Sequence, residues 1–263
     1  MLEICISFLI CIVATTLGAI SGIGGGVIIK PVMDAVSGLP VTEINFLSGC
    51  TVLCMSIVSL LRSRHGSVHI KTNIAAPLAL GAAIGGVLGS VIFDAIGNVS
   101  HNDGLIGVVQ SILMILLTLG VFLYVLLKES ITSRDVHGLL TCVFTGLFLG
   151  VLSSFLGIGG GPINLAVLYY LFSMDTKTAA LNSIYIIFFS QMTNFISSLI
   201  TGVQLTSPAM LVVMIIGGIS GGMIGSGLAR RMSGKQTDRL FMGLLAIITI
   251  VSCYNLYLYS TLL

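Results

Sequence analysis

The chain has little charge for its length. Of its 263 residues, 11 are Lys or Arg and 9 are Asp or Glu, which amounts to 8% charged residues against roughly 25% in soluble domains. A soluble domain needs more charged side chains than this to cover its surface. The net charge of +2 and the lack of a basic face exclude a nucleic-acid-binding protein. A hydrophobic content of 56% excludes a disordered chain. This composition is typical of an integral membrane protein.

Tryptophan is absent, so an aromatic belt at the membrane interface has to be built from tyrosine. Glycine is abundant, at 32 residues, which is typical of membrane helices that pack closely against one another. The histidines have no carboxylate or thiol at a spacing suited to metal binding. We therefore expect neither a metal nor a cofactor.

Apolar runs divide the chain into helical segments. A bilayer core about 30 Å thick is crossed by about 20 helical residues, and eight runs approach or exceed that length: 2–20, 44–61, 74–93, 105–127, 138–156, 178–200, 208–229 and 240–260. Two shorter apolar stretches, 26–36 and 161–173, follow the first and the fifth run. This pattern predicts an all-α polytopic membrane protein.

The sequence contains an internal duplication. Gly-Ile-Gly-Gly-Gly occurs at 22–26 and again at 157–161, an offset of 135 positions. Offsets of 135 or 136 relate three further pairs: Ser48 with Ser183, Gly85–Ser90 with Gly221–Ser226, and Gly107 with Gly243. We therefore predict two transmembrane repeats, 1–130 and 131–263, that form one membrane unit.

The basic residues favour one way of threading these repeats through a membrane. If the first and fifth runs each span together with the short stretch that follows, the Lys and Arg residues of the loops divide evenly between the two sides. If each run and its short stretch instead form a re-entrant hairpin, all of them fall on one side, as the positive-inside rule requires: Arg62, Arg64, Lys71, Lys128, Arg134, Lys177, Arg230, Arg231, Lys235 and Arg239.

The predicted fold is therefore two inverted repeats, each a broken re-entrant helical hairpin plus three transmembrane helices. Both termini are then expected outside the cell. The alternative is that the first and fifth segments span fully, because nineteen apolar residues precede the first break and such a run can cross a bilayer alone.

Each glycine break is expected to interrupt a helix, since a glycine costs about 1 kcal/mol relative to alanine in a helix interior. Irregular backbone inside a membrane has to be buried in protein or line a water-filled cavity. A helix that restarts there presents free N–H groups and a positive dipole end, which attract anions. In inverted repeats two such ends would meet near mid-membrane. We predict an anion site lined by the backbone amides of Gly24, Gly25, Gly26, Gly159, Gly160 and Gly161; the alternative is that these glycines serve close packing alone.

Lys30 lies one turn into the first restarted helix. A charged side chain within a membrane segment is costly, so it usually serves function, pairs with another charge or snorkels to the surface. Three roles are open for Lys30: a contact to the anion, a snorkelling lysine, or a partner for Asp34 or Glu43. The two carboxylates are also the nearest candidates for carrying a coupling proton.

Other polar side chains extend the candidate substrate site. Asn164 lies in the matching turn of the second restarted helix, and Ser48, Asn182 and Ser183 lie on the helices that follow the hairpins. Ser48 and the pair Asn182–Ser183 are the strongest substrate candidates, because the serine recurs in both repeats. Hydrogen bonding between helices is the alternative role for this group.

The duplicated Gly-Ile-Gly-Gly-Gly, in a chain of two four-segment halves, resembles the TauE/SafE family of sulfite exporters, also called toluene-sulfonate uptake permeases. Gly22–Gly26 followed by Pro31 is similar to the family's first motif, whereas Ala166 stands where the second motif usually has proline. The resemblance implies a permease in the cytoplasmic (inner) membrane of a prokaryote. Its substrates would be sulfur-containing anions such as sulfite, thiosulfate or sulfonates.

We therefore expect a secondary transporter that moves a small anion by alternating access, with a proton as its candidate coupling ion. The alternative is a transporter or channel for another small anion, such as an organic carboxylate. A membrane-embedded enzyme is disfavoured because no Gly-Lys-Ser/Thr follows the breaks and no intramembrane His or Asp pair is available for acid–base chemistry. The glycine-rich faces of 81–89 and 217–227 pack either within the monomer or in a homodimer.

Overall fold

The computed structural model describes residues 2–64, 66, 68–100, 103–128, 130–136, 138–202 and 206–261. These described residues form ten α-helices and no strand, which confirms the all-α prediction. The helices are α1 (Leu2–Ser21), α2 (Gly26–Val36), α3 (Val41–Ser63), α4 (Thr72–Ser100), α5 (Asp103–Leu127), α6 (Leu139–Phe155), α7 (Pro162–Phe172), α8 (Thr176–Thr201), α9 (Pro208–Arg231) and α10 (Gly234–Ser260).

Seven of these helices are long and apolar enough to cross a membrane: α1, α3, α4, α5, α8, α9 and α10. The helices that follow the glycine breaks, α2 and α7, have 11 residues each. At 20 residues α1 is long enough to span alone, so the first broken pair has one long and one short arm. α6, the first arm of the second pair, has 17 residues.

Two helices extend beyond the predicted apolar runs. α10 begins at Gly234, six residues before the run 240–260, because Ser233 and Gln236 form a capping box that starts the helix in a polar segment. α4 continues to Ser100, past the end of the run 74–93. Apolar content therefore locates the membrane-spanning part of a helix, whereas capping side chains decide where the helix begins.

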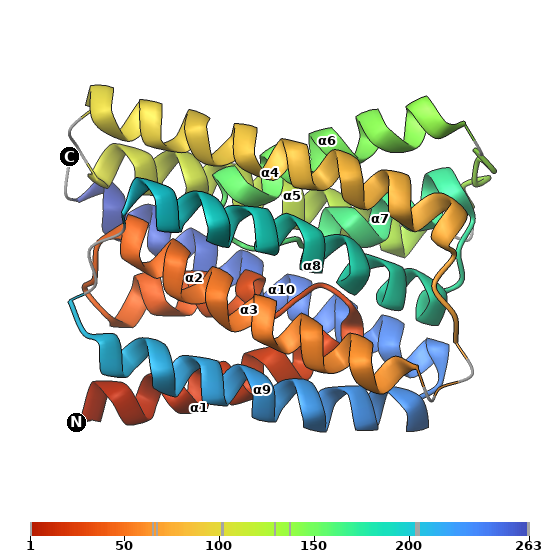
Figure 1. Ribbon diagram of the computed structural model, residues 1–263, viewed down its shortest axis with the longest axis horizontal. Coiled ribbons are helices and arrows are strands. Elements are labelled where there is room, and N and C mark those ends of the chain that lie inside the picture. Colours follow the sequence, from red (N-terminus) through yellow and green to blue (C-terminus); the bar gives the residue numbers. More distant parts are fainter. Residues whose placement is uncertain are drawn as a thin grey trace.

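The helices lie side by side in one bundle (Figure 1). α3, α4 and α5 cross it in alternating directions, and so do α8, α9 and α10. The start of α1 and the end of α10 lie at the same end, here called the terminal end. The helix ends and loops that carry the ten loop Lys and Arg residues lie at the opposite end, here called the basic end. α1 and α2 form a pair that starts and finishes at the terminal end, whereas α6 and α7 start and finish at the basic end (Figure 1).

Contacts between helices occur in matched pairs when the two halves are exchanged. α1 packs along α9 as α6 packs along α4; α3 contacts α9 as α8 contacts α4; and α2 lies against α10 as α7 lies against α5. The boundary predicted at 130/131 falls in the connection between α5 and α6. The division of the chain into two repeats at that point stays a prediction.

Glycines allow the closest of these helix contacts. A Cβ atom on Gly81 or Gly85 would collide with the backbone of α6, and one on Gly225 would collide with the backbone of α1. The glycine-rich faces of 81–89 and 217–227 therefore pack within the monomer. A homodimer, which stays a prediction, would have to use another surface.

The main apolar core lies among α5, α7, α8 and α10 and includes Leu165, Leu168, Phe172, Phe241 and Leu245. Large apolar side chains are also exposed on the outside of the bundle, among them Leu116, Leu140, Ile200 and Ile250. An apolar outer surface suits contact with lipid tails rather than water.

Candidate functional site

The two glycine breaks, far apart in sequence, lie in contact. A Cβ atom placed on Gly26 would collide with the carbonyl oxygen of Ile158, and one placed on Gly24 would lie 3.8 Å from the carbonyl oxygen of Gly159. We call this contact the glycine crossing. Ile187, near the middle of α8, packs against Gly24 from one break and against Gly160 from the other. The crossing therefore lies near the middle of the bundle.

Each break reaches the crossing from a different end of the molecule. Gly22 packs on Ala180, near the start of α8 at the basic end, whereas Gly157 packs on Asn45, near the start of α3 at the terminal end. Ala180 follows Asn45 by 135 positions, so the two contacts are equivalent in the two repeats. The breaks thus approach each other from opposite directions, and α2 and α7 start where the breaks meet.

Glycine is required in these breaks by backbone conformation as well as by space. A positive φ, which residues with a Cβ rarely adopt, occurs in both breaks: Gly22 (80°), Gly24 (80°), Gly157 (64°), Gly159 (68°), Gly160 (127°) and Gly161 (149°). Gly25 differs, since its φ of −69° is helical and it caps α2. A Cβ on Gly25 would contact Thr15 of α1 at 2.7 Å, so this glycine serves close packing against the first arm.

The starts of α2 and α7 are not equal as sources of backbone donors. Helical N–H groups in a first turn have no acceptor within the helix, and α2 starts with Gly26, which retains its N–H. α7 starts with Pro162, which has none. The third amide of each helix is already in use, because Ile28 donates to the Gly25 carbonyl at 3.0 Å and Asn164 to the Gly161 carbonyl at 3.1 Å, so the difference lies at the first residue. More of the available backbone donors at the crossing therefore come from α2.

Buried polar side chains without hydrogen-bond partners surround the crossing. Ser48 is fully buried with an unpartnered hydroxyl, and its Oγ lies 3.1 Å from a Cβ position on Gly26. Ser183, one turn before Ile187, is also fully buried and unpartnered. Asn164 is 2% exposed, its Oδ1 has no partner, and its Nδ2 lies 3.5 Å from a Cβ position on Gly160. Leaving such groups unsatisfied costs about 1–3 kcal/mol each, so their positions favour a polar ligand.

Lys30 has a different environment from these residues. Its Nζ lies 2.8 Å from Oδ2 of Asp34, and the two side chains are 3% and 6% exposed. A lysine this buried does not snorkel to the surface, so of the three open roles the structure shows the ion pair with Asp34. Glu43 accepts hydrogen bonds from the backbone N–H and the hydroxyl of Thr206, at 2.8 and 2.6 Å, which holds the chain before α9 against α3.

Asn182 has partners at both ends of its side chain. Its Oδ1 accepts from the Lys71 backbone amide at 3.0 Å, and its Nδ2 donates to the Thr178 carbonyl at 2.7 Å. The first bond joins α8 to the residue before α4, and the second lies within α8. Ser48 and Asn164 thus lie beside the crossing, each with an unpartnered oxygen, and Ser183 lies one turn from Ile187, whereas both polar atoms of the Asn182 side chain are hydrogen-bonded within the protein.

Two polar residues beside the second break are not among the predicted site residues. Gln191 is 3% exposed, and its Nε2 lies 3.0 Å from a Cβ position on Gly159. Asn45 has an unpartnered Oδ1 and packs on Gly157. Their counterparts in the other repeat are Ser56 and Ala180, so a search for residues shared by both repeats does not find them. Their polarity within apolar helices was the available signal.

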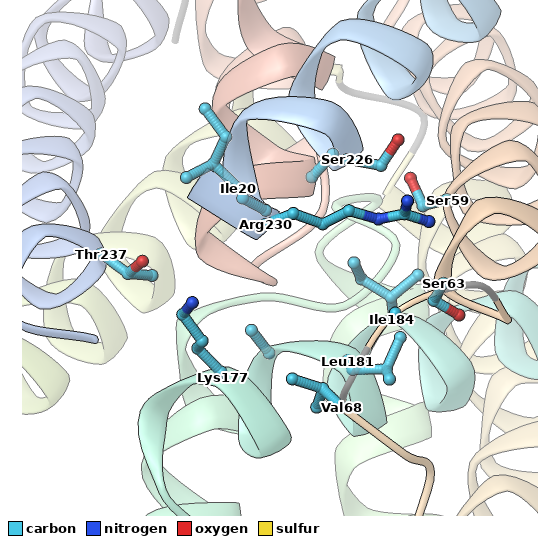
Figure 2. A pocket seen from close by; sticks show the side chains of 14 residues that line it. Ile20, Ser59, Ser63, Val68, Lys177, Leu181, Ile184, Ser226, Arg230 and Thr237 are labelled. Atoms are coloured by element: carbon cyan, nitrogen blue, oxygen red, sulfur yellow. The ribbon is translucent and has the colours of Figure 1, made fainter. Parts of the chain in front are cut away.

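A pocket of about 300 Å³ opens at the basic end, between the ends of α1, α3 and α9 and the starts of α8 and α10. Figure 2 shows Arg230 and Lys177 extending over it from α9 and α8. Ser59, Ser63 and Thr237 add hydroxyl groups to its lining. We call it the basic-end pocket. Its wall includes Ala180, on which the first glycine break packs.

Asp175 caps the start of α8 beside this pocket. Its Oδ2 accepts from the Thr178 backbone amide at 3.2 Å. Burial raises the pKa of Asp175, but hydrogen bonds from the Thr178 side chain and from the amides of Thr178, Lys177 and Asp175 outweigh it, so its pKa lies below the ordinary value.

A smaller pocket of about 90 Å³ lies towards the terminal end, where Gly157 and Gln191 form part of its wall. We call it the terminal-end pocket. Several of its residues correspond to residues of the basic-end pocket at the repeat offset of 135. With the terminal-end residue named first, the pairs are Thr42 and Lys177, Asn45 and Ala180, Phe46 and Leu181, Gly49 and Ile184, and Ser198 and Ser63. The two pockets are therefore equivalent surfaces of the two halves, one wide and one narrow.

A bundle of membrane-length helices with two broken helices that meet between two pockets is the architecture of a membrane transport protein. The family model described as "Sulfite exporter TauE/SafE" matches residues 7–252. The chain belongs to this family of membrane transporters, which confirms the resemblance seen in its sequence.

A curated relative is similar to part of the chain. The "Probable membrane transporter protein YunE" of Bacillus subtilis (strain 168) is 30% identical over 109 residues, 41% of this chain and 38% of the relative. The match thus spans well under half of that relative's length. No solved structure matches the chain significantly.

Proposed function

We propose that this protein is a secondary transporter that carries a small sulfur-containing anion, such as sulfite, thiosulfate or a sulfonate, across the cytoplasmic membrane. The anion binds at the glycine crossing. The observation that carries this proposal is the fully buried, unpartnered hydroxyl of Ser48 beside Gly26, together with its repeat counterpart Ser183. Hydroxyls and first-turn amides are both hydrogen-bond donors, as an oxyanion requires.

The matched contacts of the two halves support inverted repeats that move by alternating access. The equivalent pockets lie on either side of the crossing, and only the basic-end pocket is wide. If each half adopts the conformation that the other half has in this structure, the basic-end pocket closes and the terminal-end pocket opens. The helices and their connections stay the same. By the positive-inside rule the basic end faces the cytoplasm and both termini lie outside.

The basic-end pocket is suited to receive an anion. Lys177 and Arg230 line it, whereas Thr42 takes the place of Lys177 in the terminal-end pocket. Positive side chains at the mouth of a recess raise the local anion concentration. Binding at the crossing is then completed by uncharged donors, so that the anion can also leave.

The experiment is counterflow in proteoliposomes with radiolabelled sulfite, thiosulfate, methanesulfonate and acetate. A carrier shows trans-stimulation by unlabelled anion, whereas a channel does not. The variant Ser48→Ala/Ser183→Ala should raise the half-saturation constant at least tenfold, since a hydrogen bond to a charged group contributes about 1.5–3 kcal/mol.

Ser56→Ala is the matched control. Ser56 is also fully buried on α3, but its hydroxyl donates to the Leu53 carbonyl at 2.7 Å, so its loss should leave the half-saturation constant unchanged. Counterflow of acetate alone would reassign the substrate to carboxylates. Equal effects of the double variant and the control would refute the site.

A further inference from the structure

A second polar cluster is buried one helical turn beyond the start of α2. The Lys30–Asp34 ion pair lines a cavity of about 10 Å³ together with Gln110 of α5 and Ser252 and Asn255 of α10. This is room for about one occupant the size of a water molecule. The cluster belongs neither to the glycine crossing nor to the basic-end or terminal-end pocket.

The cluster offers more acceptors than donors. Four of its oxygens have no hydrogen-bond partner among the described residues: Oδ1 of Asp34, Oε1 of Gln110, Oγ of Ser252 and Oδ1 of Asn255. The amide nitrogens are already in use, because Gln110 Nε2 donates to the Phe155 carbonyl at 2.6 Å and Asn255 Nδ2 donates to the Pro31 carbonyl at 2.8 Å. A backbone carbonyl can accept only from the NH₂ group of a side-chain amide. These two bonds therefore fix which end of each amide is the oxygen, and leave both oxygens without a donor. Three of the four free oxygens can only accept, and the Ser252 hydroxyl can both accept and donate, so the cavity suits a proton.

This cluster is not duplicated, unlike the pockets and the glycine breaks. Leu165 and Tyr169 occupy the positions equivalent to Lys30 and Asp34, 135 residues further on. Leu165 is a fully buried member of the apolar core. The two halves are therefore not equivalent at this point, and the buried charge pair belongs to the first half alone.

Lys30 and Asp34 are the titratable residues among those that line the cavity. The neighbouring helices direct their ionisable groups elsewhere within the described part of the chain. Glu43 of α3 is bonded to Thr206, and Cys11 of α1 is buried in the apolar cluster around Ile29 and Met33. On α10, Cys253, Tyr254 and Tyr257 are exposed, Asp238 pairs with Lys128, and Tyr259 is buried in a separate apolar cluster with Phe93 and Ile106. Glu3 and Cys5 of α1 are exposed.

We propose that Lys30 and Asp34 form the proton-coupling site of the transporter, an inference that rests on the proposed function. In the ion pair the two charges cancel. A proton taken up by the Asp34 carboxylate gives the neutral acid, whose O–H donates to one of the free amide oxygens. The remaining oxygens then accept from the Lys30 ammonium, which has lost its counter-charge. The otherwise unused acceptors are thus satisfied in the protonated state.

Protonation of Asp34 strengthens anion binding through α2. Lys30 follows Gly26 by four residues, which is about 6 Å along the helix axis. At an effective dielectric constant of about 20, a positive charge uncovered within about 10 Å of a monovalent anion raises anion affinity more than about tenfold. Anion and proton therefore bind together, and a proton gradient drives anion accumulation.

The test compares coupling with transport in proteoliposomes, with radiolabelled sulfite, thiosulfate and methanesulfonate as probes. The unmodified protein should concentrate at least one probe in response to a pH gradient. Asp34→Asn should keep counterflow at uniform pH but lose gradient-driven accumulation, and its half-saturation constant should no longer change with pH. Lys30→Gln/Asp34→Asn, which leaves no unpaired buried charge, should give the same result if Asp34→Asn alone does not fold.

Glu43→Gln is the matched control, since it neutralises another buried carboxylate on a membrane helix, and it should keep gradient-driven accumulation. The coupling site is overturned if the folded Asp34 variants still concentrate a probe in response to a pH gradient. A sodium gradient that drives accumulation where a pH gradient does not would overturn the assignment to protons. Absence of counterflow for every probe with the unmodified protein would overturn the proposed function itself, and the coupling site with it.

Discussion

Replacing Gly26 by alanine sets two physical effects against each other. Gly26 is the first residue of α2, where alanine is favoured over glycine by up to about 1 kcal/mol. Its φ is not positive, so the backbone tolerates a side chain. A Cβ atom there would, however, collide with the Ile158 carbonyl oxygen and lie 3.1 Å from Ser48 Oγ. The first neighbour is backbone, which cannot rotate away, so the two breaks have to separate.

Overpacking of this kind costs about 1–3 kcal/mol, so we expect Gly26→Ala to be destabilising by up to about 2 kcal/mol despite its better helix propensity. The matched control is Gly243→Ala on α10, where a Cβ meets nothing within 4 Å. That change should stabilise the protein by about 0.5–1 kcal/mol. Because Gly26 belongs to the proposed site, its replacement should also reduce counterflow at least tenfold, whereas Gly243→Ala should leave it unchanged.

The assay is thermal unfolding in detergent, followed by counterflow of the folded protein. Opposite shifts in melting temperature for the two variants, with loss of counterflow confined to Gly26→Ala, are the expected result. A Gly26→Ala protein that is as stable and as active as Gly243→Ala would refute the close contact between the breaks.

Three further predictions concern the basic end and the helix contacts. Asp175→Ala should destabilise the protein by about 1 kcal/mol through loss of the α8 cap, measured by thermal unfolding. Because the pKa of Asp175 is lowered on folding, its ionic contribution is present above the ordinary carboxyl pKa and is lost as the pH falls through the lowered value; the difference from Asp175→Asn should vanish in acid. Lys177→Ala/Arg230→Ala should slow anion entry from the basic end and reduce its dependence on salt, measured as initial uptake rates. Gly85→Val should separate α4 from α6 or unfold the protein, because a side chain at Gly85 collides with the backbone of α6. Size-exclusion chromatography measures this effect.

The glycine breaks were predictable because glycine acts locally. Four glycines in five residues interrupt a helix in any context, and the half-length helices after them followed from the lengths of the apolar stretches. Residues separated by the repeat offset also make equivalent contacts in the structure, as the Gly22–Ala180 and Gly157–Asn45 contacts show.

The roles of individual polar side chains depended on tertiary structure. Lys30 and Asp34 have the i, i+4 spacing of neighbours on a helix, but burial decided between pairing and snorkelling, and burial is not visible in one sequence. Asn182 lies next to Ser183 in sequence, yet its side chain is bonded to the backbone amide of Lys71, just before α4. The residue that matches Gln191 in the first repeat is Ser56, which is of a different type. The position of Gln191 beside Gly159 therefore required coordinates.

The most direct test of the central claim is the position of a bound anion. Selenite, the selenium analogue of sulfite, can be located by anomalous diffraction from crystals of the protein grown with it. The expected result is a peak at the glycine crossing, within hydrogen-bond reach, about 3 Å, of the Ser48 hydroxyl. Selenite found beside Lys30, or only in the basic-end pocket, would contradict an anion site formed by the two glycine breaks.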